Sequence, residues 1–289
     1  TEESRELQKL QEFQEFQESQ KRGQTAGRRT HRGDMTAELA EGKILPLIVR
    51  LSVPAVVAQL ITFLYNIVDR MYVARIADVG MDALAALGIV LPITLIMQAF
   101  ANLVGLGGAP RAGIRMGEGN RAEANGIFNT AFLLLLFTGV VIGAVAFGCA
   151  LPIVRLFGCP PSAEAFAVSY LKIYACGTVF VMLAQGLNPF IQTQGYSLIA
   201  MGTVLLGAVL NILFDPLFIF TFGMGVRGSS LATVISQGCS ALCVVAFFFT
   251  RRSLFRFRLR EMRPVPARVG SIVSLGFTPF VMTITECAI

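Results

Sequence analysis

The sequence predicts an all-α integral membrane protein built from several transmembrane helices. Hydrophobic residues make up 54% of the 289-residue chain and charged residues only 15%, which is outside the usual range of soluble proteins. The mean hydropathy is +0.66, an apolar excess too large for one soluble core to bury. Acidic residues also fall inside at least two apolar segments, where they are costly and usually functional.

Six complete apolar segments and the beginning of a seventh have the length of a membrane-spanning helix, which is about 20 residues. They are expected at residues 45–68, 83–106, 128–153, 168–191, 199–222 and 231–250, and from 269 to the chain end at 289. These runs are too long, and alternate too little, for the strands of an outer-membrane β-barrel.

Four parts are therefore predicted along the chain. Residues 1–34 form a polar, repetitive segment that is expected to be a disordered tail, or else an upstream stretch with Met35 as the true start. Residues 35–250 form a lobe of six transmembrane helices, residues 251–268 a basic connector, and residues 269–289 the truncated start of a seventh helix.

The net charge of +6 is carried by arginines in the connectors between apolar segments, which indicates membrane orientation rather than a nucleic-acid partner. The connector after the sixth span contains Arg251, Arg252, Arg256, Arg258, Arg260, Arg263 and Arg268. Because basic residues favour the cytoplasmic side, the N-terminus and this connector are expected in the cytoplasm, with the helices in the cytoplasmic membrane.

Metal, disulfide and hydrolytic chemistry are not expected. The six cysteines form no CxxC pair, the only histidine is His31 near the terminus, and there is no GxSxG sequence. Gly223, Gly225 and Gly228 match GxGxxG, but no βαβ unit surrounds them, so a turn between two helices is predicted. No organic cofactor and no enzymatic activity are predicted.

Polar residues in the first span recur at helical spacing. Gln59, Thr62, Asn66 and Asp69 are spaced 3, 4 and 3 residues apart, which places them on one helical face. An aspartate in this setting should face protein or water. Alternatively, Asp69 marks the helix end and pairs with Arg70 or Arg75.

The fifth span repeats the arrangement, with Thr203, Gly207, Asn211 and Asp215 at intervals of four residues. Pro216 leaves the carbonyl of Ile212 without its helical donor, and Pro54 does the same in the first span. A freed carbonyl beside an acid suits a cation or water, and a proline kink suits a hinge, although a static kink satisfied by a neighbouring helix is the common alternative.

Other spans also carry polar side chains. They include Gln98, Asn102, Gln185, Asn188, Gln192, Thr233, Ser236, Gln237 and Ser240. Single hydroxyls usually bond a neighbouring helix, but amides on most spans favour a shared aqueous cleft. Gly139 and Gly143 form a GxxxG pair on the third span, which predicts close helix packing.

Five short segments together resemble the MATE (multidrug and toxic compound extrusion) transporters. They are TFLYNIVD, DALAALG, IQTQGYS, NILFDPLFIF and SLATVISQ, and the resemblance extends in order over residues 45–289. It implies two six-helix lobes related by a pseudo-two-fold axis. This chain would then be the N-terminal lobe with the start of the seventh helix, and the C-terminal lobe of the same protein would be its missing partner.

The resemblance to the DinF-like branch of that family also implies a coupling-ion site for H⁺ or Na⁺ in this lobe. Asp69 matches its NxxD acid and Asp215 its NxxxDP acid, whereas Asn211 and Thr233 match the accompanying polar ligands. Pro54 matches the proline at which the first helix bends, and Glu286 more loosely matches an acid of the seventh helix.

The function expected is cation-coupled antiport, in which an organic cation or drug leaves the cell as H⁺ or Na⁺ enters. Two acids facing one cavity could exchange protons, so that ion and substrate compete for the same negative site. One alternative is a lipid-linked oligosaccharide flippase of the same superfamily, whose cavity should be cationic. Another is a membrane-embedded enzyme that uses Asp69 and Asp215 as a catalytic pair.

Overall fold

The computed structural model describes residues 44–76, 79–257 and 265–288. It divides into two units, Thr1–Arg50 and Leu51–Ile289, and every contact discussed below lies within the second unit. The predicted tail at residues 1–34 falls outside the described residues, as do Arg258, Arg260 and Arg263 of the 251–268 connector.

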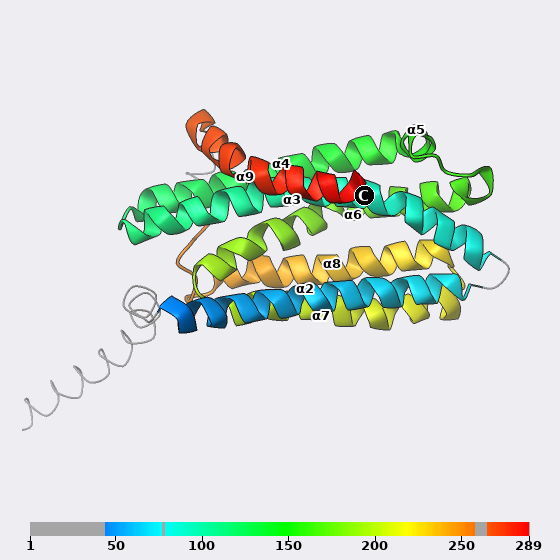
Figure 1. Ribbon diagram of the computed structural model, residues 1–289, viewed down its shortest axis with the longest axis horizontal. Coiled ribbons are helices and arrows are strands. Elements are labelled where there is room, and N and C mark those ends of the chain that lie inside the picture. Colours follow the sequence, from blue (N-terminus) through cyan, green and yellow to red (C-terminus); the bar gives the residue numbers. More distant parts are fainter. Residues whose placement is uncertain (1–43, 77–78, 258–264, 289) are drawn as a thin grey trace, which may run out of the picture. The chain divides into compact units, whose positions relative to one another are not determined.

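The described residues form helices and no strands (Figure 1). The elements are α2 (Ile44–Ala74), α3 (Gly80–Gly117), α4 (Arg121–Gly148), α5 (Ala150–Leu156), α6 (Pro161–Thr193), α7 (Ser197–Pro216), the π-helical turn η1 (Leu217–Thr221), α8 (Val226–Phe249) and α9 (Pro266–Ala288). Seven helices among the described residues are long and apolar enough to cross a membrane, which confirms the predicted all-α membrane fold.

Several helix boundaries differ from those expected from hydropathy, and prolines account for two of them. The third apolar segment is broken at Gly148, and the short helix α5 begins at Ala150. Pro152 explains the break, because it has no N–H to donate to the carbonyl of Gly148. The seventh helix begins at Pro266 rather than Val269, since proline is favoured at the first helical position.

Helix α6 is the centre of the bundle and packs against α3, α4 and α8. Glycines allow the close approach of α4. A Cβ on Gly139 would lie 3.1 Å from the Cα of Val179, and one on Gly143 would lie 2.7 Å from the carbonyl oxygen of Ala175. The predicted packing role of this GxxxG pair is confirmed.

The first residues of the connector after α8 pack into the bundle. The ring of Phe128, which is fully buried, stacks on Phe255 at 5.5 Å between centroids and contacts Phe257 at 5.1 Å. The Oε1 atom of Gln194 accepts a hydrogen bond of 2.6 Å from the backbone N–H of Leu254. This connector was expected to be a basic loop, but aromatic burial fixes its first residues against α4 and α6.

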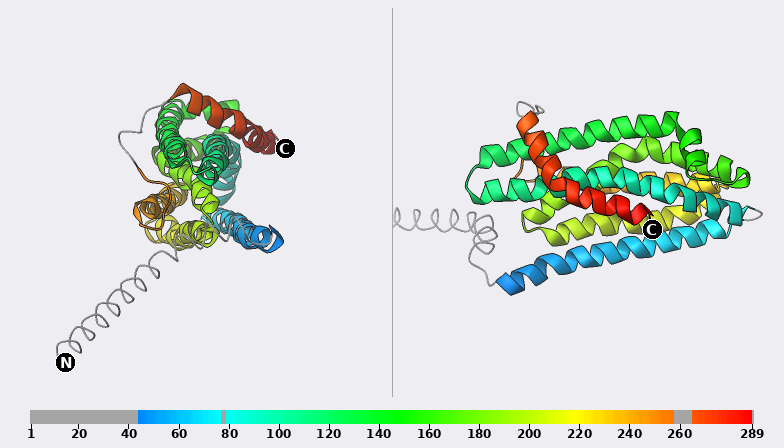
Figure 2. Two further views of the ribbon diagram at one scale, coloured as in Figure 1. Left: turned by 90° about the vertical axis from the view of Figure 1, so that its left-hand side faces the viewer. Right: turned by 45° about the horizontal axis from the view of Figure 1, so that its top comes forward.

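Helix α2 is among the least enclosed of the long helices. Only 11% of its apolar window is buried, and Val56 and Phe63 are 58% and 59% exposed. Near its C-terminal end, Tyr72 contacts Phe220 of η1 at 6.3 Å between ring centroids. Helix α9, which crosses α3 on another side of the bundle (Figure 2), is likewise only 11% buried. Both exposed surfaces suit contact with lipid or with further protein.

Candidate functional site

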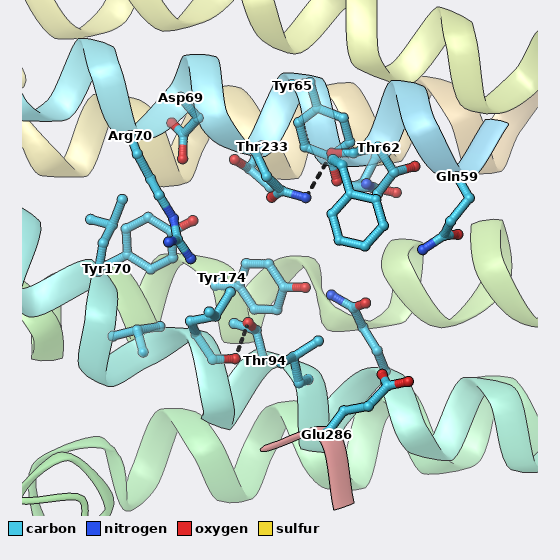
Figure 3. A pocket seen from close by; sticks show the side chains of 18 residues that line it. Gln59, Thr62, Tyr65, Asp69, Arg70, Thr94, Tyr170, Tyr174, Thr233 and Glu286 are labelled. Carbon is cyan, nitrogen blue, oxygen red and sulfur yellow. Dashed lines mark hydrogen bonds between the residues drawn. The ribbon is translucent and has the colours of Figure 1, made fainter. Parts of the chain in front are cut away.

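A polar cavity of about 260 Å³ lies between α2, α3, α6, α8 and α9. Eight of the polar residues singled out from the sequence line it: Gln59, Thr62, Asn66, Asp69, Gln98, Thr233, Gln237 and Glu286. Figure 3 shows the α2 residues along one wall and Glu286 reaching in from α9. The aqueous cleft predicted from aligned polar residues therefore has a counterpart in the structure.

The polar side chains of α2 are held against their own helix. The hydroxyl of Thr62 donates to the carbonyl of Ala58 at 3.0 Å, and the amide of Asn66 donates to the carbonyl of Thr62 at 2.8 Å. These local bonds satisfy donors that would be costly in an apolar environment. Asp69, at the end of the row, instead accepts a hydrogen bond from another helix.

Asp69 is buried although it lies on the exposed helix α2, with only 8% of the residue accessible. Its Oδ1 accepts a hydrogen bond of 2.7 Å from the hydroxyl of Ser229 on α8. Arg70 adds an attractive charge at longer range, but no ion pair joins Asp69 to Arg70 or Arg75 within the described ranges. The helix-end pairing considered as an alternative is therefore not the arrangement seen.

Asp215 is completely buried on α7, directly before Pro216. Neither of its carboxylate oxygens accepts a hydrogen bond from any described residue. Nearby on the same helical face, Asn211 donates from Nδ2 to the hydroxyl of Thr233 at 3.2 Å. The Oδ1 of Asn211 and the hydroxyl of Ser236 are also buried without a partner among the described residues. Unpaired buried oxygens of this kind are costly unless a proton or a cation joins them.

The carboxyl groups of Asp69 and Asp215 lie close enough for the charge of each to act on the other. Two ionised carboxylates at this range repel, and neither supplies a donor to the other. A shared proton or a bound cation would remove both problems. The structure thus brings together the four residues for which the resemblance implies a coupling-ion site, which are Asp69, Asp215, Asn211 and Thr233.

Aromatic residues of α6, which the spacing of polar residues does not indicate, form the wall opposite α2. Tyr170 and Tyr174 of α6 stack at 6.3 Å between ring centroids with an interplanar angle of 16°. Both line the cavity together with Tyr65 and Thr94 (Figure 3). Their separation by four residues on one helix is the pattern that would have indicated a shared face.

Ser229 was also missed, because a single serine in an apolar helix usually bonds only its neighbours. Conversely, Gln185 and Asn188 were predicted to line the cleft but lie outside the cavity lining. The amide of Asn188 donates to the carbonyl of Ala200 at 3.0 Å and to the hydroxyl of Thr203 at 3.1 Å. It connects α6 to α7 instead.

The two prolines occupy different local structures. Helix α2 continues through Pro54 without interruption, whereas Pro216 is followed at once by the π-helical turn η1. Short π-helical segments in membrane helices frequently mark functional sites. A hinge role for Pro54 and Pro216 stays a prediction.

Membrane-crossing helices around a polar cavity that ends in a buried pair of carboxyl groups define a polytopic membrane protein of the transporter type. The model of the MatE family matches residues 54–217, and the chain belongs to this family of multidrug and toxic compound extrusion transporters. The particular DinF-like branch stays a prediction.

Known relatives agree with this assignment. The chain is 27% identical over 233 residues to the multidrug export protein MepA of Staphylococcus saprophyticus, covering 81% of this chain and 51% of MepA. These relatives are export proteins rather than enzymes. The chain spans about half the length of the curated relatives it matches.

Solved structures show the same fold. A MOP superfamily transporter from Pyrococcus furiosus, described as having a binding pocket of reverse polarity that suggests a different function, is 26% identical with a TM-score of 0.78. The match covers 85% of this chain and 54% of that one. A MATE crystal structure in the bent conformation is also 26% identical, with a TM-score of 0.78, and covers 85% and 55% of the two chains.

Proposed function

We propose that this chain forms the ion-coupling lobe of a multidrug exporter that exchanges an organic cation for H⁺ or Na⁺ across the cytoplasmic membrane. The observation that carries the proposal is the double role of Asp69. Its side chain lines the polar cavity and also lies close enough to the buried carboxyl group of Asp215 for the two charges to influence one another. A cationic substrate that binds Asp69 from the cavity therefore competes with a coupling ion that binds between Asp69 and Asp215.

The coupling ion is expected at Asp215. Its two carboxylate oxygens, the Oδ1 of Asn211 and the hydroxyl of Ser236 are buried oxygens without partners among the described residues. Carboxylate, amide and hydroxyl oxygens are the ligands that hard cations prefer. The same set is satisfied by protonation, since a protonated carboxyl group gains an O–H donor. Both H⁺ and Na⁺ fit this chemistry.

The substrate is expected to be a small organic cation. Tyr170 and Tyr174 present aromatic rings to the cavity, and Asp69 and Glu286 supply negative charge. Cations are attracted to the faces of aromatic rings within about 6 Å. A flippase of the same superfamily should instead have a cationic cavity. Here Arg70 is the one arginine among the residues that line it.

Coupling follows from this competition. When an ion occupies the Asp69–Asp215 pair, Asp69 no longer attracts the substrate, and the cation is released. The reshaping is expected at Pro54 and Pro216, because a proline has no N–H to donate to the carbonyl four residues earlier in its helix. A ligand shifts such an equilibrium only by its differential affinity for the two states, and the shared carboxyl pair provides that difference. A second six-helix lobe is expected to complete the cleft.

The decisive experiment measures ethidium efflux by the protein in an efflux-deficient strain. Asp69→Asn and Asp215→Asn should each abolish coupled efflux. Asp82→Asn is a matched control, because Asp82 is an acid at the start of α3 that bonds Ser162 at 2.8 Å and lies outside the cavity lining. Intact efflux in both site variants would show the mechanism to be wrong.

Proteoliposomes separate the remaining possibilities. Transport driven by a pH gradient alone indicates H⁺, and transport that requires a Na⁺ gradient indicates Na⁺. Resistance of the expressing strain to ethidium and norfloxacin supports drug export. Failure to protect that strain, combined with uptake of a lipid-linked oligosaccharide, would support the flippase instead. The expected cytoplasmic N-terminus is tested in oriented vesicles, by finding on which side of the membrane a protease cleaves the loops that contain Lys and Arg.

A further inference from the structure

A second cavity, of about 290 Å³, lies at the arginine-rich end of the bundle, away from the acid pair. It is formed where α3 ends and α4 and α9 begin. Its charged residues are Arg111, Arg115, Arg268, Glu118 and Glu123. Neither the sequence patterns nor the transport proposal assigns it a role.

Two of its three arginines are already neutralised. Arg268 forms a two-pronged ion pair with Glu123, with N···O distances of 2.8 Å and 3.1 Å. Arg115 pairs with Glu118 at 2.8 Å. Each glutamate is thereby committed to one arginine, so neither is left to balance the third.

Arg111 is the remaining positive charge. Its Nη2 donates to the hydroxyl of Ser274 at 3.1 Å, and this neutral oxygen is its only acceptor among the described residues. Its Nε is buried with no acceptor in that part of the chain. A guanidinium group carries five donors in a planar fork, and a partly buried charge without a counter-charge is costly. An anion beside Arg111 would balance this charge.

We propose that this cavity binds a phosphate group, with Arg111 as the principal ligand. The guanidinium fork of arginine forms two parallel hydrogen bonds to phosphate oxygens, whereas the ammonium group of lysine acts as a point charge. Apolar residues complete the wall: Ile127, Ala267 and Ile114, the last of them 61% exposed. Such a wall suits the glycerol and first methylene groups of a lipid beside the phosphate.

The location supports the same ligand chemistry. The arginine-rich end is the one expected to face the cytoplasm, where the leaflet surface is negatively charged and basic pockets between helices bind anionic headgroups. The phosphate group could belong to an anionic phospholipid or to a soluble phosphate compound. Either ligand would bind Arg111 through its phosphate oxygens, but only the phospholipid would also contact the apolar wall.

The test uses the purified protein in nanodiscs of phosphatidylcholine with increasing phosphatidylglycerol, and in a second arm phosphatidylcholine nanodiscs titrated with inorganic phosphate. Bound lipid is measured by native mass spectrometry, and stability by thermal unfolding. Arg111→Gln should weaken binding of the anion about tenfold, as expected for loss of a charge-assisted hydrogen bond. Arg121→Gln is the control, because Arg121 is exposed at the start of α4 and does not line the cavity.

Each outcome decides between the possibilities. Stabilisation by phosphatidylglycerol alone, lost in Arg111→Gln, assigns a lipid headgroup, whereas equal stabilisation by inorganic phosphate assigns a soluble phosphate. The proposal is overturned if Arg111→Gln binds phosphatidylglycerol and inorganic phosphate as tightly as the unchanged protein does. If Arg111→Gln does not fold, Arg111→Lys should bind more weakly, because it keeps the charge but loses the fork, and Ser274→Ala should bind at least as well. Identical anion binding by Arg111→Lys and Ser274→Ala also overturns the proposal. These measurements of lipid binding and thermal unfolding do not depend on drug transport by the protein.

Discussion

The hydroxyl of Ser229 on α8 donates a 2.7 Å hydrogen bond to the carboxyl group of Asp69 on α2. It is a buried polar link between helix α2 and helix α8. Hydrogen bonds to charged groups contribute about 1.5–3 kcal/mol. This bond thus joins α2 to α8 at the acid that lines the cavity.

Ser229→Ala should weaken coupling more than it weakens folding. Loss of the bond removes a donor that favours the ionised form of Asp69, so we expect a change in the ion concentration needed for half-maximal efflux, by roughly tenfold. The measurement is drug efflux against pH or Na⁺ in proteoliposomes.

Ser230→Ala is the matched control for that change. Ser230 is equally buried on the same helix, but its hydroxyl donates to the backbone carbonyl of Tyr170 at 2.9 Å. It should lower stability by about 1 kcal/mol without moving the ion dependence. The role assigned to Ser229 fails if both variants shift the ion dependence equally.

The stacked tyrosines should determine affinity for cationic substrates. Tyr174→Leu removes an aromatic face from the cavity wall, and a cation–π contact contributes about 0.5–2 kcal/mol. The KM for ethidium efflux should therefore rise several-fold. Tyr174→Phe keeps the ring and should retain most of the affinity. A KM that changes equally in both variants would point to the hydroxyl instead.

Crossing of α9 over α3 requires a glycine at position 276. A Cβ there would collide with the backbone carbonyl of Leu103, which cannot move as a flexible side chain can. Gly276→Ala should lower the free energy of unfolding by about 1–3 kcal/mol, the usual cost of overpacking. The measurement is thermal unfolding of the purified protein.

Gly270→Ala on the same helix serves as its control. A Cβ at Gly270 meets nothing within 4 Å, and alanine is the better helix former by about 1 kcal/mol. This variant should be as stable as the unchanged protein or slightly more so. Equal destabilisation by the two substitutions would contradict the crossing geometry.

The packed beginning of the connector depends on Gln194. Gln194→Ala would leave the backbone N–H of Leu254 without its 2.6 Å acceptor and Ser253 without its 3.2 Å one. An unsatisfied buried group costs about 1–3 kcal/mol, so the unfolding temperature should fall. Gln194→Glu retains an acceptor oxygen and should lose less. Increased protease sensitivity around residue 254 would be the local readout.

The sequence by itself was sufficient to predict the membrane helices and the row from Gln59 to Asp69. A long apolar run predicts a spanning helix without reference to any neighbour, and helical spacing determines which residues share a face. The helix boundaries were less accurate because hydropathy does not register single backbone donors. Pro152, which interrupts the third apolar segment, is the example.

Which polar residues meet could not be decided in that way. Asn188 and Gln237 look alike in an apolar segment, yet Asn188 bonds α7 while Gln237 lines the cavity. Only the tertiary structure brought Ser229 to Asp69 and left Asp215 without a donor among the described residues. Periodicity determines the face of one helix, whereas partners on different helices depend on how the helices pack, and that packing is set by contacts distant in sequence.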